Sequence, residues 1–141
     1  LANVVGSITA GIAGGRFSKK YLLCLLYSAR AVVITIFVLT PATPVSVLVF
    51  ALVIGFLCLS TVPLTTALVA QIFGVRYMAT LVGIVFFSHQ LGSFTGIWLG
   101  GYLFDTTGSY DVVWWLGVAL ALAAALVHWP IDERSLRPAE A

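Results

Sequence analysis

The sequence predicts an all-α integral membrane protein, and three observations lead to this fold class. Of its 141 residues, 61% are hydrophobic and only 9% are charged. The mean hydropathy is +1.10, and a soluble domain of this length could not hide so much apolar surface in one core. The apolar residues fall into five runs separated by short polar boundaries, so we expect five membrane-spanning helices.

The boundaries between the runs contain turn-forming and charged residues. They are GRFSKK, TPATP, QIFGVRY, DTTGSYD and a tail that begins at Pro130, whose missing amide hydrogen ends the last helix. Residues 1–129 therefore form one transmembrane unit, and residues 130–141 form a polar tail. The expected spans are about 1–15, 21–39, 45–70, 78–104 and 112–129.

The first run, residues 1–15, is rich in small residues. At 1.5 Å per residue it reaches only ~22 Å, which is less than the ~30 Å hydrocarbon core of a bilayer. We therefore expect the chain to be the C-terminal piece of a longer protein. Its small residues form overlapping stripes along which a neighbouring helix can pack closely. They are Gly6, Gly11, Gly14 and Gly15, with Ser7 and Ala10. Asn3 would lie ~18 Å deep, counted back from the end of the run.

The second run, residues 21–39, contains one cation. Arg30 would lie ~14 Å from the start of its helix, near the middle of the membrane. A charged side chain there costs at least ~2.5 kcal/mol unless it is paired, and none of the five predicted runs contains Asp or Glu. Two interpretations stay open. Arg30 binds an anionic ligand, or it joins two helices through backbone or side-chain acceptors.

The third run, residues 45–70, contains Pro63, which should kink the helix and free backbone carbonyls. Ser60 and Thr61 would lie ~14 to 15 Å deep, at the level of Arg30. Their hydroxyls either satisfy the freed carbonyls or line a pathway for a solute, and the sequence leaves both interpretations open.

The fourth run, residues 78–104, contains no formally charged residue and would form a helix ~40 Å long. Histidine can change its charge near neutral pH, so His89, ~17 Å from the start of this run, could relay a proton or hold an anion. A neutral imidazole bonded across a helix interface is the alternative. Gln90 projects ~100° around the helix from His89. A stripe for close packing with another helix is formed by Gly92, Gly96 and Gly100.

The positions of the cations indicate the orientation in the membrane. Apart from Arg30, the Lys and Arg residues all lie in the first, third and fifth boundaries, which share one side if every run crosses. By the positive-inside rule this side is the cytoplasm, where we expect the C-terminus, and the short loops suit a bacterial inner membrane. These cations are Arg16, Lys19, Lys20, Arg76, Arg134 and Arg137.

The sequence gives little support to an enzyme or to a nucleic-acid-binding protein. It contains no Ser/His/Asp arrangement, no paired carboxylates and no metal-ligand cluster, and its net charge is only +2. Cys24 and Cys58 lie in apolar runs without a CxxC spacing, so we predict neither a disulfide nor a metal site. We expect no cofactor.

Two segments resemble a known family. The segment GIAGGRFSKK resembles the loop signature of the major facilitator superfamily (MFS), Gly-x-x-x-Asp-Arg-x-Gly-Arg-Arg/Lys. Gly15 stands where that signature has Asp, and Ser18 where it has its second Gly. The segment FGVRYMATLVGIVFFSHQLGSFTGIWLGGYLFDTTGSYD is similar to the last helix pair of monocarboxylate-porter-like members. The positions that fit the loop signature are Gly11, Arg16, Lys19 and Lys20.

The resemblance implies a fold and a function. The five runs would match helices 8 to 12 of a twelve-helix carrier, so residues 1–129 would be an incomplete C-terminal half that requires the N-terminal helices of the same carrier. The span with Pro63 would face the central cavity, the helix with His89 would border both halves, and the helix with Arg30 would be more peripheral. We expect a secondary transporter that works by alternating access and moves a small organic anion, such as a monocarboxylate, together with a proton.

Two other functions stay open at this point. The chain could belong to an efflux carrier for amphiphilic, drug-like solutes, or it could be a truncated membrane fragment or scaffold that transports nothing. In each case the protein lies in the lipid bilayer. The residues that we expect along the substrate pathway are Arg30, Ser60, Thr61, His89, Gln90 and Asn3.

Overall fold

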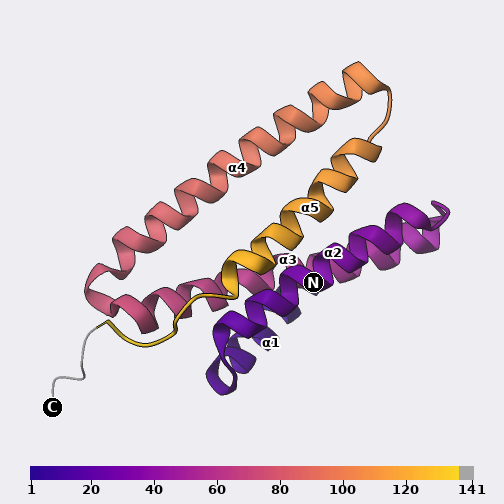
Figure 1. The fold of residues 1–141 in the computed structure, drawn as a ribbon. Coiled ribbons are helices and arrows are strands. Elements are labelled where there is room, and N and C mark those ends of the chain that lie inside the picture. Colours follow the sequence, from indigo (N-terminus) through magenta and orange to yellow (C-terminus); the bar gives the residue numbers. More distant parts are fainter. Residues whose placement is uncertain (137–141) are drawn as a thin grey trace, which may run out of the picture.

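The computed structural model describes residues 1–136, which fold into five α-helices and one short 3-10 helix (Figure 1). The predicted all-α fold is confirmed. Arg137, one of the cations of the expected tail, lies outside the described residues. The helices are α1 (Ala2–Arg16), α2 (Lys19–Leu39), α3 (Pro44–Phe73), α4 (Met78–Thr107) and α5 (Asp111–His128), and the 3-10 helix η1 (Val75–Tyr77) leads into α4.

Four of the helices are long and apolar enough to cross a membrane. They are α2, α3, α4 together with η1, and α5, and the most apolar part of each has a mean hydropathy of 2.3, 2.7, 1.2 and 1.8 respectively. α1 contains 15 residues and is shorter than the other four α-helices. That α1 also crosses the membrane stays a prediction.

Several helices extend further than predicted, and two of their ends have a recognisable cap. Thr43 starts α3 through a capping box in which its hydroxyl accepts from the Ser46 amide. Gly108 ends α4 at a φ of 70°, a left-handed conformation that favours glycine. α4 runs to Thr107 because the hydroxyls of Thr106 and Thr107 donate to helix carbonyls instead of breaking the turn.

Four of the helices form a packed group. α3 lies along both α1 and α2, and α2 lies along α5. Leu23 of α2 and Leu64 of α3 are almost completely buried between these helices. Near the 40–43 connection, the rings of Phe37, Phe50 and Trp114 join α2, α3 and α5, with Phe37 stacked on Phe50 at a centroid distance of 4.1 Å.

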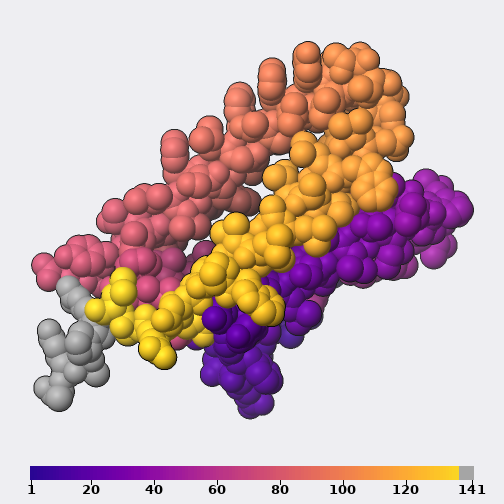
Figure 2. All heavy atoms as spheres, viewed as in Figure 1, coloured from indigo at the N-terminus to yellow at the C-terminus, as the bar shows by residue number. Residues whose placement is uncertain are grey.

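The fifth helix, α4, stands apart from this group. Figure 1 shows that it is joined to α3 at one end and to α5 at the other and diverges from both along its length. Gly100 is the one buried residue of α4 within the described chain. In the space-filling view, the side chains of α4 along the upper edge project outward with no other part of the chain beyond them (Figure 2). A long apolar helix surface is therefore left without a partner in residues 1–136.

Candidate functional site

The centre of α3 is where hydrogen-bonding groups from neighbouring helices meet. Arg30 extends from α2 and donates from Nη2 to the carbonyl of Leu57 at 3.0 Å and, at 3.4 Å, to that of Cys58. Its guanidinium carbon also lies 5.1 Å from the centroid of the Tyr27 ring. Arg30 Nε is buried and has no hydrogen-bond partner in the described part of the chain. The cation is thus compensated by backbone carbonyls and an aromatic face.

Pro63 explains a second contact at the same level. Because proline has no amide hydrogen, the carbonyl of Leu59, four residues earlier, loses its usual donor. Ser7 of α1 replaces it, since its hydroxyl donates to the Leu59 carbonyl at 3.2 Å. From the sequence, Ser7 is expected only to permit close packing. The signal that could have identified it is the unpaired carbonyl that Pro63 leaves on α3, facing a helix rich in small residues.

The two predicted hydroxyls of α3 lie beside these contacts. Ser60 is 1% exposed, and its hydroxyl donates to the Phe56 carbonyl in its own helix. Thr61 donates to the Cys58 carbonyl at 2.9 Å. Both hydroxyls therefore bond to carbonyls within α3, and neither bonds to the Leu59 carbonyl that Pro63 frees. Asn3 of α1 is exposed, and its side chain lies close to Gly55 of α3.

The predicted polar residues of α4 are separate from this cluster. His89 and Gln90 are exposed, and within residues 1–136 neither makes a hydrogen bond. The nearest ring to His89 is that of Phe86, at a centroid distance of 6.5 Å. The structure therefore brings Arg30, Ser60 and Thr61 together around one segment of α3, and it leaves the two α4 side chains facing away from the rest of the described chain.

A groove runs between α4 and α5. Its volume is about 550 Å³ and its lining is mainly apolar. A methyl group at Gly92 or Gly96 would meet nothing within 4 Å, and one at Gly100 would meet Val113 at 3.9 Å. The predicted small-residue stripe thus lies on the groove, and of its three glycines only Gly100 is close to another helix of the described chain. Residues that line it include Gly92, Gly96 and Gly100 of α4 and Val113, Gly117 and Leu120 of α5.

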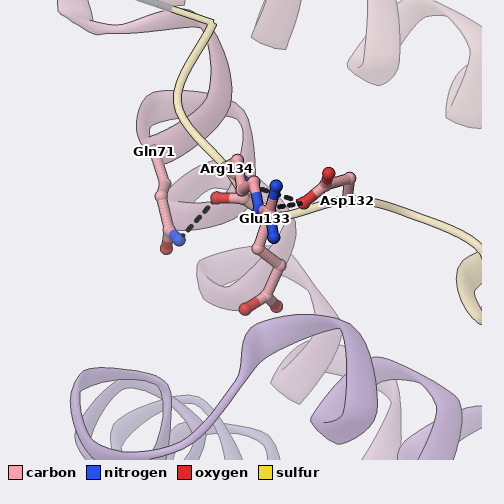
Figure 3. A network of polar contacts seen from close by, with 4 residues as sticks. All are labelled: Gln71, Asp132, Glu133 and Arg134. Atoms are coloured by element: carbon pink, nitrogen blue, oxygen red, sulfur yellow. Dashed lines mark hydrogen bonds and ion pairs between the residues drawn. The ribbon is translucent and has the colours of Figure 1, made fainter. Parts of the chain in front are cut away.

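The first, third and fifth boundaries meet at one end of the molecule. The Lys19 ammonium donates to Gln71 Oε1 at 2.7 Å. Figure 3 shows the next bond, in which Gln71 Nε2 donates to the Glu133 carbonyl at 2.8 Å. The Glu133 carboxylate accepts from the backbone amide of Lys20. The tail also adds a bond from the Leu136 amide to the Ile72 carbonyl, at 2.9 Å. The predicted common end of these boundaries is therefore confirmed.

The residues of the loop signature behave differently from one another. Lys19 and Lys20 belong to this end network, whereas Gly11 and Arg16 are exposed. Sequence reasoning did not identify Glu133, which places a carboxylate at the start of α2 although Gly15 stands where the signature has its Asp. An acid in a tail on the same side as two lysines is the signal that could have indicated it.

The ionisable groups in the described residues form no cluster of three or more that could hold a metal ion. The family model of the Major Facilitator Superfamily matches residues 1–141. Monocarboxylate transporter 12-B of Danio rerio is 28% identical over 129 residues, which cover 89% of this chain and 27% of that protein. The chain thus spans about a quarter of the length of this relative. No solved structure matches the chain significantly. The 141 residues belong to the Major Facilitator Superfamily, a family of membrane transporters and not of enzymes.

Proposed function

We propose that this chain is the C-terminal part of a secondary carrier that works by alternating access and moves a small organic anion, such as a monocarboxylate, together with a proton. The observation that carries the proposal is the similarity to a protein named as a monocarboxylate transporter, extending over 89% of the chain. On this proposal the rest of the pathway comes from helices outside the 141 residues, and the five helices are helices 8 to 12 of twelve.

The chemistry of α4 suits such a substrate. A carboxylate and a proton taken up together carry no net charge, which lowers the cost of passing through the middle of a membrane. A protonated imidazole donates charge-assisted hydrogen bonds to a carboxylate, and a primary amide adds a neutral donor. His89 and Gln90 are exposed on the helix that has the fewest contacts with the rest of the described chain. We assign His89 the proton-responsive role and Gln90 and Asn3 polar positions along the pathway.

Arg30, Ser60 and Thr61 act on the same pathway through α3. The two bonds from Arg30 to the carbonyls of Leu57 and Cys58 tie α2 to the segment that precedes Pro63. This fixes the irregular part of α3, where a carrier of this type would expose backbone and hydroxyl groups to its substrate. Arg30 is therefore a positioning residue in this proposal.

The network at the polar end makes the packed helices move together. Lys19, Gln71 and Glu133 connect the start of α2, the end of α3 and the tail. Such a connection favours rocking of this half as one body against the other half. Because the cations gather at this end, we assign it to the cytoplasm, in a bacterial inner membrane.

The test is uptake of radiolabelled short-chain monocarboxylates into proteoliposomes that contain the full-length parent carrier. Saturable uptake that increases when an inward proton gradient is imposed is the expected result. Correctly inserted protein that takes up no monocarboxylate under either condition would overturn the substrate assignment. A parallel assay of efflux of an amphiphilic cationic dye, from the same vesicles, identifies the drug-like alternative. Absence of both activities would favour a scaffold.

A further inference from the structure

The tail that follows α5 provides caps for the ends of two different helices. The first amides of an α-helix lack acceptors within the helix, and its last carbonyls lack donors. At the start of α2, the Lys20 amide donates to the Glu133 carboxylate, whose negative charge also suits the positive end of the helix dipole. At the end of α3, the Ile72 carbonyl accepts from the Leu136 amide at 2.9 Å. The tail therefore offers each helix end the group that this end lacks.

α2 also has a capping residue of its own that is not in use. Ser18 is its N-cap residue, and serine is favoured there because its hydroxyl can accept from the second or third amide of the helix. Lys20 is the second helical residue, so Glu133 occupies an amide that Ser18 could bind. The Ser18 hydroxyl is buried and has no hydrogen-bond partner within residues 1–136. An unsatisfied buried hydroxyl costs free energy, and this cost opposes the bond that the tail makes to α2.

Beyond Ile131 the tail buries little apolar surface. Ile131 itself packs against the core cluster that includes Leu23. In residues 132–136 every residue except Glu133 is exposed, and Leu136 is 71% exposed. Hydrogen bonds, and not buried apolar side chains, therefore hold this segment on the helix ends. Water can replace such bonds at a small net cost.

We propose that residues 132–136 form a reversible strap with a docked and a released state. In the docked state Glu133 caps α2 and Leu136 caps α3. In the released state the Ser18 hydroxyl rotates to accept from the first amides of α2, while Ile131 stays packed and acts as the hinge. Because α2 has a cap in both states, the two states lie close in free energy, as a conformational switch requires.

The strap controls how firmly the end of α3 is fixed. The docked strap adds its bonds to the bond between Lys19 and Gln71, which joins α2 to α3 directly. α3 continues through η1 into α4, which has few contacts with the rest of the described chain. Release therefore gives α4 more freedom to move relative to the packed helices. This consequence rests on the proposed alternating access, whereas the exchange of caps does not.

The test measures the distance between two spin labels by pulsed electron paramagnetic resonance. It uses the full-length carrier in lipid nanodiscs, with its native cysteines, including Cys24 and Cys58, replaced by alanine. The labels are attached to Leu136→Cys on the strap and Ile36→Cys on α2, and both positions are exposed. Counted from Lys19, Ile36 lies ~25 Å along α2, a distance suited to the method. A narrow distance peak represents the docked strap, and a broad distribution represents the released strap.

Two substitutions should shift the ratio of released to docked carrier in opposite directions. Glu133→Ala should raise this ratio about fivefold, the change that corresponds to one capping bond. Asp132→Asn is the control, because it removes a neighbouring charge but keeps an acceptor for the Arg134 amide, and it should leave the ratio unchanged. Ser18→Ala should lower the ratio about fivefold, since only the released state uses its hydroxyl. It is made in Glu133→Gln, whose neutral acceptor is weaker and leaves both states populated.

Three results would overturn the inference. A narrow peak that is the same in wild type and Glu133→Ala would show that the carboxylate does not hold the tail. A narrow peak alone in Glu133→Gln would show that the tail has no released state. A ratio that Ser18→Ala leaves unchanged or raises would show that the caps do not exchange. Because none of these measurements uses transport, a strap that switches as expected in a carrier without monocarboxylate uptake would contradict the proposed substrate alone.

Discussion

The close approach of α1 to α3 can be tested by adding a single methyl group at Gly6. In Gly6→Ala the new carbon would collide with the Phe56 carbonyl and lie 2.7 Å from the Ser60 hydroxyl. A backbone carbonyl cannot rotate away as the end of a flexible side chain can, so α1 must move outward as a whole. Ser60 is 1% exposed, so the surroundings offer no space for a smaller adjustment.

The expected loss of unfolding free energy follows from two contributions. Overpacking of a well-packed contact costs about 1 to 3 kcal/mol. Outward movement of α1 also lengthens the hydrogen bond from Ser7 to the Leu59 carbonyl, now 3.2 Å, and interhelical bonds in membranes contribute about 0.6 kcal/mol. The matched control is Gly11→Ala, where a methyl group meets nothing of the described chain within 4 Å. The helix propensity gained from alanine is the same in both variants and cancels, so the difference should be about 2 to 4 kcal/mol.

The assay is unfolding of the purified full-length carrier by SDS titration, followed by far-UV circular dichroism, for wild type, Gly6→Ala and Gly11→Ala. Gly6→Ala should unfold at a clearly lower SDS fraction, whereas Gly11→Ala should match or exceed wild type. Equal midpoints for the two alanine variants would show that α1 does not approach α3 as closely as described, and the helix-packing argument would fail.

Three further changes test other contacts. Glu133→Ala removes the acceptor for the Lys20 amide at the start of α2 and should lower the unfolding free energy by about 1 kcal/mol, whereas Glu133→Gln keeps an acceptor oxygen and should recover most of it in the same titration. Arg30→Lys keeps the charge but replaces the planar guanidinium with a single ammonium group, so it should lower the unfolding free energy by about 1.5 to 3 kcal/mol. Arg16→Lys, at an exposed position, is the control and should leave the unfolding free energy unchanged. In uptake assays, His89→Ala should abolish the stimulation by a proton gradient, and an unchanged ratio of uptake with and without the gradient would refute its proton-responsive role.

The features that depend on composition and order along the chain could be predicted from the sequence. Apolar runs bounded by polar segments give helices because a backbone in lipid must satisfy its own hydrogen bonds. The alternation of cation-bearing boundaries predicted a common end, and the network of Lys19, Gln71 and Glu133 lies there. The start of α2 was placed too late and the end of α4 too early, because lysine and threonine were taken as breaks although both can continue a helix.

The features that depend on the direction of a side chain around its helix could not be predicted in this way. Counting residues placed Arg30 and His89 at a similar depth, but depth does not give the helix face. Arg30 faces α3 and bonds to its carbonyls, whereas His89 faces away from the described helices. The glycine stripe on α4 likewise predicted close packing without identifying the partner. Three-dimensional contacts supply that direction, as they do for Arg30.

The surroundings of Arg30 also show why a buried cation here requires no carboxylate. The Leu57 carbonyl can accept the bond from Arg30 beside the one within the helix, because a carbonyl oxygen has two lone pairs. The longer bond from Arg30 to the Cys58 carbonyl shares that oxygen with the Thr61 hydroxyl. The Tyr27 ring adds a favourable contact with the guanidinium. An anion in the pathway would therefore have to compete with contacts that Arg30 already makes. His89 makes no hydrogen bond within the described chain, so an anion could bind it without breaking one there. This difference is why the proposed mechanism assigns Arg30 to positioning α3 and His89 to the substrate and its proton.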